Sequence, residues 1–187
     1  MEYMGMMSVC NSGGADGADA TFGLYAKQIK HQVNHFAFRG MKSKCEDIVL
    51  LDPINLRIAD PYLLQANKTL KRQFPCRSEY VNNLLRRNYW QVRDTNAVFA
   101  AAPLNNNMVE GGTAWAVQMA LDMHVPILYI FDLTTNKWHQ WLYSMGKWEY
   151  LLPNEVFKPD NFSVYTGIGS RELTFEGYDA IKWLYGQ

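Results

Sequence analysis

Three short apolar runs in this chain are each followed by a glycine-containing turn and then by a segment with helical periodicity. The runs cover residues 6–10, 97–102 and 163–165, and their turns contain Gly13, Gly111 and Gly167. A short apolar run bounded by turn residues is typical of a buried strand. Strands that alternate with helices favour a parallel sheet with both faces covered. The pattern predicts an α/β fold, a single Rossmann-like domain over residues 1–187 with a mainly parallel sheet flanked by helices.

The remaining segments complete this prediction. Ser78 is a candidate N-cap for one of the helices. Residues 103–112 are expected to form a polar loop, and residues 39–59 and 133–160 to be loop-rich insertions, with a possible hairpin over 138–150. Apolar spacing predicts further strands over 33–38 and 125–131, and helices over 15–29, 61–74, 78–92, 114–123 and 173–185.

Composition and sequence pattern disfavour several classes of protein. The 187 residues carry 18 basic and 18 acidic side chains, so nothing supplies the long-range attraction that sequence-independent nucleic-acid binding needs. The longest apolar run, residues 125–131, is too short to span a bilayer. The start of the chain lacks the pattern of a signal peptide, and three cysteines without a CxxC spacing favour free thiols. We expect a cytoplasmic protein, or one in the host-cell cytoplasm if the source is viral.

Motifs for several kinds of chemistry are absent from the sequence. The glycine turns match neither GxGxxG nor GxxxxGK[ST], which disfavours dinucleotide dehydrogenases and nucleoside-triphosphate hydrolases. The four histidines are scattered without HExxH or an acidic partner, so no metal is expected. No GxSxG elbow is present. We therefore assign no catalytic residue and no cofactor.

The glycine turns themselves favour anion binding. A helix that begins directly after a strand directs free backbone N–H groups toward the carboxyl edge of the sheet, and glycine lets a phosphate approach them closely. In open α/β sheets, ligands bind at this edge. Three such turns on one edge would enclose a phosphorylated ligand, although a single turn of this kind is often only a connection.

Five motifs, in order along the chain, resemble a branch of the SLOG superfamily, the Rossmann-like domains related to DprA proteins and LOG-type cytokinin-activating enzymes. The motifs span nearly the whole chain, and together they are specific. They are SGGADGAD at 12–19, LRRNYWQV at 85–92, GGTAWAVQMA at 111–120, IFD at 130–132 with Trp138, and TGIGSREL at 166–173.

The resemblance implies a nucleotide-binding domain. Its ligands would be nucleotide-derived signals such as ADP-ribose derivatives or cyclic nucleotides, and its setting would be bacterial conflict, as an immune sensor or as a viral protein that sequesters the signal. Oligomerisation into a homo-oligomer is also implied, and the high aromatic content of 14% is compatible with it.

Two positions depart from the resembling families. LOG-type phosphoribohydrolases have a PGGxGTxxE motif whose glutamate serves in hydrolysis, and here Ala116 stands at that position. Alanine cannot act as an acid or a base, which argues against enzymatic hydrolysis while leaving binding intact. Ala114 replaces a glycine that is usual in the branch. An N-glycosidase remains the alternative, with Asp19 or Glu110 in place of the missing glutamate, and a DprA-like nucleic-acid module is a third hypothesis.

Each candidate binding residue also has a structural interpretation. Arg171 is placed to clamp a phosphate, or to form a surface ion pair with Glu172 or Asp179. Arg87 is placed to contact a phosphate, and Asn88 or Gln91 a base or ribose, unless these side chains only cap the helix and satisfy the strand edge.

The remaining candidates lie at the turns. Asp19 is a candidate hydrogen-bond acceptor for ribose hydroxyls, or it stabilises the dipole of its own helix. Thr113 is a candidate hydrogen-bond donor to a phosphate, or it caps the helix. Trp115 is expected to stack on a base or to pack in the core. The full predicted ligand-binding set is Ser12, Gly13, Gly14, Gly17, Asp19, Arg87, Asn88, Gln91, Gly111, Gly112, Thr113, Trp115, Gly167, Gly169, Ser170 and Arg171.

Overall fold

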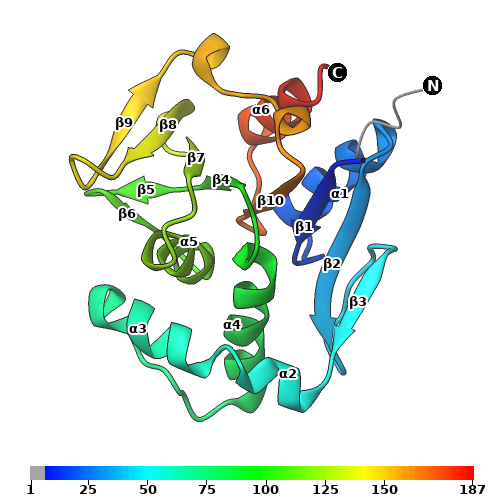
Figure 1. Ribbon diagram of the computed structural model, residues 1–187, viewed down its shortest axis with the longest axis vertical. Helices are drawn as coiled ribbons and strands as arrows, with labels where there is room; N and C mark the ends of the chain where they lie inside the picture. Colours follow the sequence, from blue (N-terminus) through cyan, green and yellow to red (C-terminus); the bar gives the residue numbers. More distant parts are fainter. Residues whose placement is uncertain (1–6) are drawn as a thin grey trace.

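The computed structural model describes residues 7–187 and contains one large, mostly parallel sheet (Figure 1). Within these residues the eight strands lie in the order β3-β2-β1-β10-β4-β7-β8-β9. Neighbours from β3 to β7 pair in parallel, and β8 and β9 add an antiparallel hairpin at one edge. The strands are β1 Val9–Ser12, β2 Gln32–Phe38, β3 Ile48–Leu51, β4 Ala97–Ala102, β7 Ile127–Asp132, β8 Lys137–Leu142, β9 Lys147–Leu151 and β10 Val164–Gly169.

Helices cover both faces of this sheet, as the sequence predicted. Helices α1 and α6 pack together on one face, while α3, α4 and α5 pack together on the other (Figure 1). The helices are α1 Ala18–Gln28, α2 Pro53–Arg57, α3 Asp60–Leu70, α4 Glu79–Val92, α5 Thr113–Asp122 and α6 Phe175–Leu184. The α/β fold class is therefore confirmed. None of the helices in residues 7–187 has the length and apolarity to span a membrane.

Strand β4 shows why its sequence contains only apolar residues. Successive side chains of a strand point to opposite faces, so Phe99 packs among the residues beneath α1 and α6, and Val98 and Ala100 pack beneath α4 and α5. All six residues of β4 are buried. A strand buried on both faces needs an unbroken apolar run, which made this element predictable.

The last strand in the sequence lies at the centre of the sheet. From β1 the chain moves outward through β2 and β3, then crosses back to build β4 and β7 on the other side, and β10 fills the position between β1 and β4. Because β1, β10 and β4 are parallel, their carboxyl ends meet at one edge of the sheet. This edge is a topological switch point, where open α/β sheets bind ligands.

Several predicted boundaries and irregular regions need correction. Ser78 caps α4, as predicted, by accepting a hydrogen bond from Val81 N–H at 3.3 Å. The loop-rich prediction was wrong for the second half of 39–59, which contains β3 and α2. Within 133–160 the hairpin expected over 138–150 is confirmed, because β8 and β9 pair there. The predicted loop at 103–112 contains a short ribbon of β5 Leu104–Asn105 and β6 Met108–Val109. Met6, placed in the first predicted strand, lies outside the described residues.

The prediction of a third strand, glycine turn and helix unit was also wrong. Gly167 and Gly169 lie within β10, and α6 begins only at Phe175, capped by the side chain of Thr174. The glycines are needed for packing, because a Cβ at Gly167 would overlap the Phe22 ring and one at Gly169 would overlap the Ala101 carbonyl. The beginning of α6 therefore does not contribute an anion site at the switch point.

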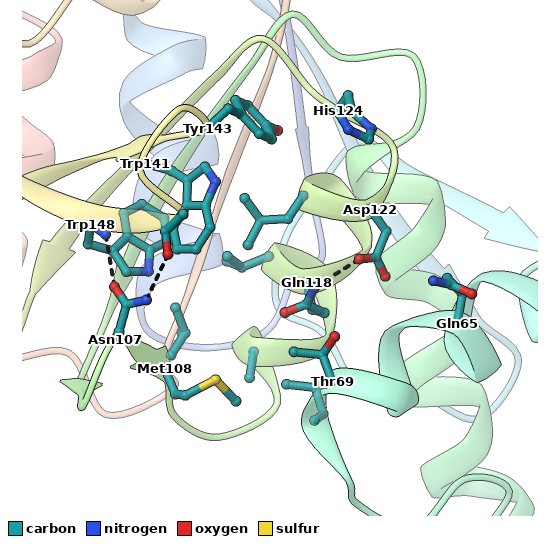
Figure 2. A pocket seen from close by; sticks show the side chains of 16 residues that line it. Gln65, Thr69, Asn107, Met108, Gln118, Asp122, His124, Trp141, Tyr143 and Trp148 are labelled. Carbon is teal, nitrogen blue, oxygen red and sulfur yellow. Dashed lines mark hydrogen bonds between the residues drawn. The ribbon is translucent and has the colours of Figure 1, made fainter.

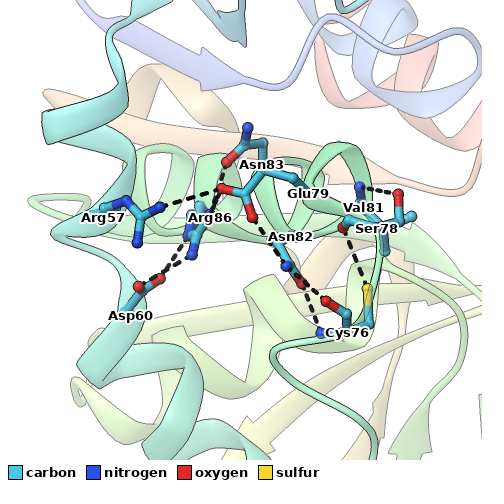
Figure 3. A network of polar contacts seen from close by, with 9 residues as sticks. All are labelled: Arg57, Asp60, Cys76, Ser78, Glu79, Val81, Asn82, Asn83 and Arg86. Atoms are coloured by element: carbon cyan, nitrogen blue, oxygen red, sulfur yellow. Dashed lines mark hydrogen bonds and ion pairs between the residues drawn. The ribbon is translucent and has the colours of Figure 1, made fainter.

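A polar network holds α2 and α3 against α4 (Figure 3). The Arg86 guanidinium is 4% exposed and binds both carboxylate oxygens of Asp60, at 2.6 and 3.2 Å, and Glu79 at 2.6 Å. Arg57 reaches the same Glu79 from α2, at 3.7 Å and mostly exposed. Arg86 is thus the buried centre of the network, and Arg57 lies at its rim.

Arg86→Ala is expected to lower the free energy of unfolding by about 2 kcal/mol, less than the roughly 3–5 kcal/mol of a fully buried pair, because Asp60 and Glu79 retain contact with water. The matched Arg57→Ala change should cost no more than about 0.5 kcal/mol, as for other exposed ion pairs. Urea denaturation of both variants measures the difference. Equal losses would show that burial of Arg86 does not matter.

Candidate functional site

A cavity of about 520 Å³ lies at the carboxyl ends of the central strands. Its walls come from the start of α1, the inner face of α4, the turn before α5 and the residues that follow β10. These segments are far apart in the sequence and meet only because β10 lies between β1 and β4. The volume falls in the range of small-molecule binding sites, which is about 300–1,000 Å³.

The α4 wall of the cavity changes from apolar to polar along the helix. Val81, Leu84 and Leu85 line one end, and Asn88 and Gln91 line the other. These positions recur at helical spacing, so one face of α4 presents all of them to the same space. The Asn88 amide also donates to the carbonyl of the α5 turn, at 3.4 Å, which ties the two elements together. The wall can therefore accept a ligand with an apolar and a polar part.

Arg87 and Asp19 form a buried pair beside the polar end. Arg87 is 6% exposed and Asp19 4% exposed, and the Arg87 Nη1 and Asp19 Oδ2 atoms lie 3.8 Å apart. Arg87 Nη1 also donates to the Gly13 carbonyl, and Asp19 Oδ1 accepts from Gly169 N–H at 3.0 Å. The pair thus joins α4, α1 and the ends of β1 and β10. Among the described residues, the buried Nε of Arg87 has no hydrogen-bond partner.

Burial shapes the electrostatics of this pair. Removal from water raises the pKa of the Asp19 carboxyl, against the opposing effects of Arg87 and of backbone N–H groups that include Gly169. Burial likewise lowers the pKa of the Arg87 guanidinium, Asp19 opposes this change, and the nearby positive charge of Arg171 adds to it. Arg87 and Arg171 thus line the cavity together with two carboxylates, of which Asp19 is buried and Glu172 is exposed.

The beginning of α5 is open toward the cavity. Gly112 occupies the N-cap position and no side chain caps the helix, so the expected capping role of Thr113 is wrong. Among residues 7–187, no atom beyond the two chain neighbours lies within 4 Å of a Cβ built at Gly111 or Gly112. An uncapped helix N-terminus carries free N–H donors and partial positive charge, both of which favour an anion. Arg72 holds the turn from the other side by donating to the Gly111 carbonyl at 2.6 Å.

The beginning of α1 is closed by the end of β10. Ala18 N–H donates to the Ser170 carbonyl at 3.0 Å, and Ser170 N–H donates to the Ala101 carbonyl at 2.8 Å. Arg171 follows, with an exposed side chain that forms no ion pair to any residue in 7–187, so the predicted pairing with Glu172 or Asp179 is not formed. Its guanidinium remains available to a ligand.

The structure brings ten of the sixteen predicted binding residues to this cavity and places six elsewhere. The ten are Asp19, Arg87, Asn88, Gln91, Gly111, Gly112, Thr113, Gly169, Ser170 and Arg171. Of the six, Trp115 packs in the core against Phe74, which was the alternative interpretation. The others lie in the supporting backbone and are Ser12, Gly13, Gly14, Gly17 and Gly167.

Sequence reasoning missed two parts of the site. The apolar stripe of Val81, Leu84 and Leu85 was recognised as a helix face, but only the structure shows that it lines a cavity. The segment 39–47 was treated as a loop, yet Ser43 donates to the Gly14 carbonyl at 2.6 Å and supports the first glycine turn. A small polar residue in a loop carries no sequence pattern that would reveal such a contact.

The residues considered for hydrolysis are not arranged for it. Ala116 lies on the buried face of α5, and Glu110 accepts a hydrogen bond from the Asn105 amide at 3.2 Å without lining the cavity. Both oxygens of Asp19 face groups of the protein. Within the part of the chain that the structure describes, no three His, Cys, Asp or Glu side chains gather in a way that could hold a metal ion.

Comparisons with family models, curated proteins and solved structures find no match to this chain. Membership of the SLOG superfamily therefore stays a prediction from the motifs, and the site is interpreted on its own geometry.

Proposed function

We propose that this chain binds a small nucleotide-derived ligand in the cavity at the switch point and holds it without turnover, as a sensor or a sequestering protein. The observation that carries the proposal is the meeting of an uncapped α5 N-terminus with a partly unpaired buried arginine and an exposed one. All three features favour an anion, and all three line the same cavity.

The phosphate would bind at the beginning of α5. Thr113 and the N–H groups of the first turn supply donors, and Arg171 supplies a planar guanidinium that suits bidentate contact with phosphate oxygens. The buried positive charge of Arg87 would attract a nearby phosphate strongly, because burial reduces screening by water. A ligand with one or two phosphates matches this set of donors.

The other part of the ligand would lie against α4. Val81, Leu84, Leu85 and Ile168 offer an apolar wall for the face of a base. Asn88 carries both a donor and an acceptor on one amide, as a base edge or ribose hydroxyls require. A nucleotide derivative combines these two chemistries in one molecule, which is why we prefer it to a simple phosphate or to an apolar ligand.

Mass spectrometry of the ligand released by heat from the purified full chain tests the proposal directly. A second arm measures thermal shifts with a panel of ADP-ribose derivatives and cyclic nucleotides. We expect one member to co-purify, or to raise the melting temperature, and to be recovered intact in proportion to the protein. Release of a free base with turnover would instead support the N-glycosidase. Failure of every panel member, with no ligand co-purified, would contradict the proposal.

Gly112→Ala separates ligand binding from folding. Gly112 has a helical backbone, with φ −68° and ψ −28°, and nothing within 4 Å of its Cβ position, so the change should keep stability within about 1 kcal/mol. The new methyl group would occupy the approach to the α5 donors. We expect the dissociation constant for the panel ligand to rise by at least about tenfold, measured by calorimetry.

The melting temperature of the ligand-free variant is the control for this experiment. An unchanged melting temperature with unchanged affinity would show that no phosphate approaches Gly112. Arg57→Gln, which removes an exposed cation outside the cavity lining, should leave affinity unchanged.

A further inference from the structure

A second cavity, of about 560 Å³, lies on the outer side of α5, away from the switch point. Its walls come from α3, α5, the β5–β6 ribbon and the β8–β9 hairpin (Figure 2). Asn107 joins ribbon and hairpin, because its amide accepts from Trp148 N–H at 2.9 Å and donates to the Gly146 carbonyl at 3.2 Å. The cavity is thus built between elements that are fixed to one another. It shares no lining residue with the first cavity.

Aromatic rings form the hairpin side of this cavity. Trp141 and Trp148 pack edge to face, with ring centroids 5.4 Å apart. Tyr143 stacks on His124, with an angle of 13° between the rings, and donates its hydroxyl to the Val125 carbonyl at 2.8 Å. The faces of such rings carry partial negative charge, which attracts cations.

A carboxylate lies on the α5 side. Asp122 Oδ1 accepts from the Gln118 amide at 2.9 Å, while Oδ2 is buried and has no hydrogen-bond partner among residues 7–187 (Figure 2). Burial raises the pKa of this carboxyl, against the Gln118 hydrogen bond and the positive charges of His124 and Lys68. Within the described residues, no lysine or arginine lines the cavity and Asp122 is its one acidic side chain. Leaving a carboxylate oxygen without a donor is costly.

We infer that this cavity is a second ligand site, and that its ligand is an organic cation with a flat apolar body. The ammonium group would compensate the Asp122 carboxylate, and the apolar body would lie against the tryptophans. An anion would meet the carboxylate, and among the described lining residues only His124 can carry a positive charge to offset it. A neutral apolar molecule would gain nothing from the carboxylate. The inference is independent of the nucleotide proposal, because the two cavities have no lining residue in common.

Two probes with the same ring test the role of charge. Tryptamine carries an ammonium group, and tryptophol carries a hydroxyl in its place. We expect tryptamine to bind the ¹⁵N-labelled chain at least about tenfold more tightly, as judged from the indole N–H resonances of Trp141 and Trp148. Asp122→Asn keeps the acceptor for Gln118 but removes the charge. The ratio of tryptamine affinity to tryptophol affinity should therefore fall to about one, while the tryptophol affinity itself stays the same.

Asp94→Asn is the matched control, since it removes the same charge at an exposed position outside the cavity and should preserve the ratio. If Asp122→Asn fails to fold, Trp141→Leu is the variant to measure. It removes one aromatic ring face from the cavity, so both probes should bind more weakly. Equal affinities of the two probes for the unmodified chain would overturn the inference. The inference would also be overturned if the resonances of Trp141 and Trp148 did not move at millimolar tryptamine. A preference for tryptamine that persisted in Asp122→Asn would overturn it as well.

Discussion

Arg87→Met is expected to lower the free energy of unfolding by about 3–5 kcal/mol, the range for breaking a buried ion pair by removing one partner. Methionine fills much of the same volume, but it leaves the Asp19 carboxylate without its countercharge and the Gly13 carbonyl without its donor. The charge, and not the packing, is therefore the main loss. Urea denaturation measures the change in the unfolding free energy.

A double-mutant cycle isolates the ion pair. Asp19→Asn keeps an acceptor for Gly169 N–H but removes the charge that Arg87 compensates. The double variant should be more stable than the sum of the single losses predicts, by about 1–3 kcal/mol. Arg93→Met, at the exposed end of α4 over the Trp90 ring, is the matched control and should cost no more than about 1 kcal/mol. Additive losses would show that Asp19 and Arg87 stabilise the fold separately.

Gly17→Ala is expected to cost about 4 kcal/mol, because it combines backbone strain with an overlap that cannot relax. Gly17 has φ 87° and ψ −129°, a conformation that essentially only glycine adopts. Its missing Cβ would also overlap the carbonyls of Ser170 and Arg171, which are backbone atoms held by β10 and α1. Both effects act at the junction that closes the beginning of α1.

Gly111→Ala separates the two effects. Gly111 also has a positive φ, of 66°, but nothing lies within 4 Å of its Cβ position. The change should therefore cost only the strain, about 1–2 kcal/mol. Thermal and urea unfolding of both variants measure the difference. Similar losses at the two positions would mean that the contact between Gly17 and the end of β10 is looser than the structure indicates.

The buried strand β4 and the longer helices were the most predictable parts of the fold. The apolar run that became β4 is buried on both faces, and only an uninterrupted apolar segment satisfies that environment. Helix α4 was predicted with its cap because Ser78 and the spacing of its apolar residues are local features. Strand β3 was missed because it has only four residues, flanked by mixed charge, and its pairing with β2 is not a local property.

The candidate site was predictable only in part, for the same reason. Ten predicted residues line the cavity. They could be predicted because glycine turns and an arginine near a strand are local features that suggest anion contacts. The direction of each side chain was not predictable. Trp115 lies two residues after Thr113, yet it points into the core while Thr113 lines the cavity, because successive positions of a helix face different sides.

Local pattern alone was enough to establish alternating strands and helices, a sheet covered on both faces and a set of glycine turns, because burial on a strand or helix repeats with a fixed period. The position of β10 between β1 and β4 depended on contacts between segments more than sixty residues apart. That position closes the beginning of α1, while the beginning of α5 stays open and Arg87 is buried beside the cavity. These features follow from the packing of distant segments against one another. A local window of sequence does not contain that information.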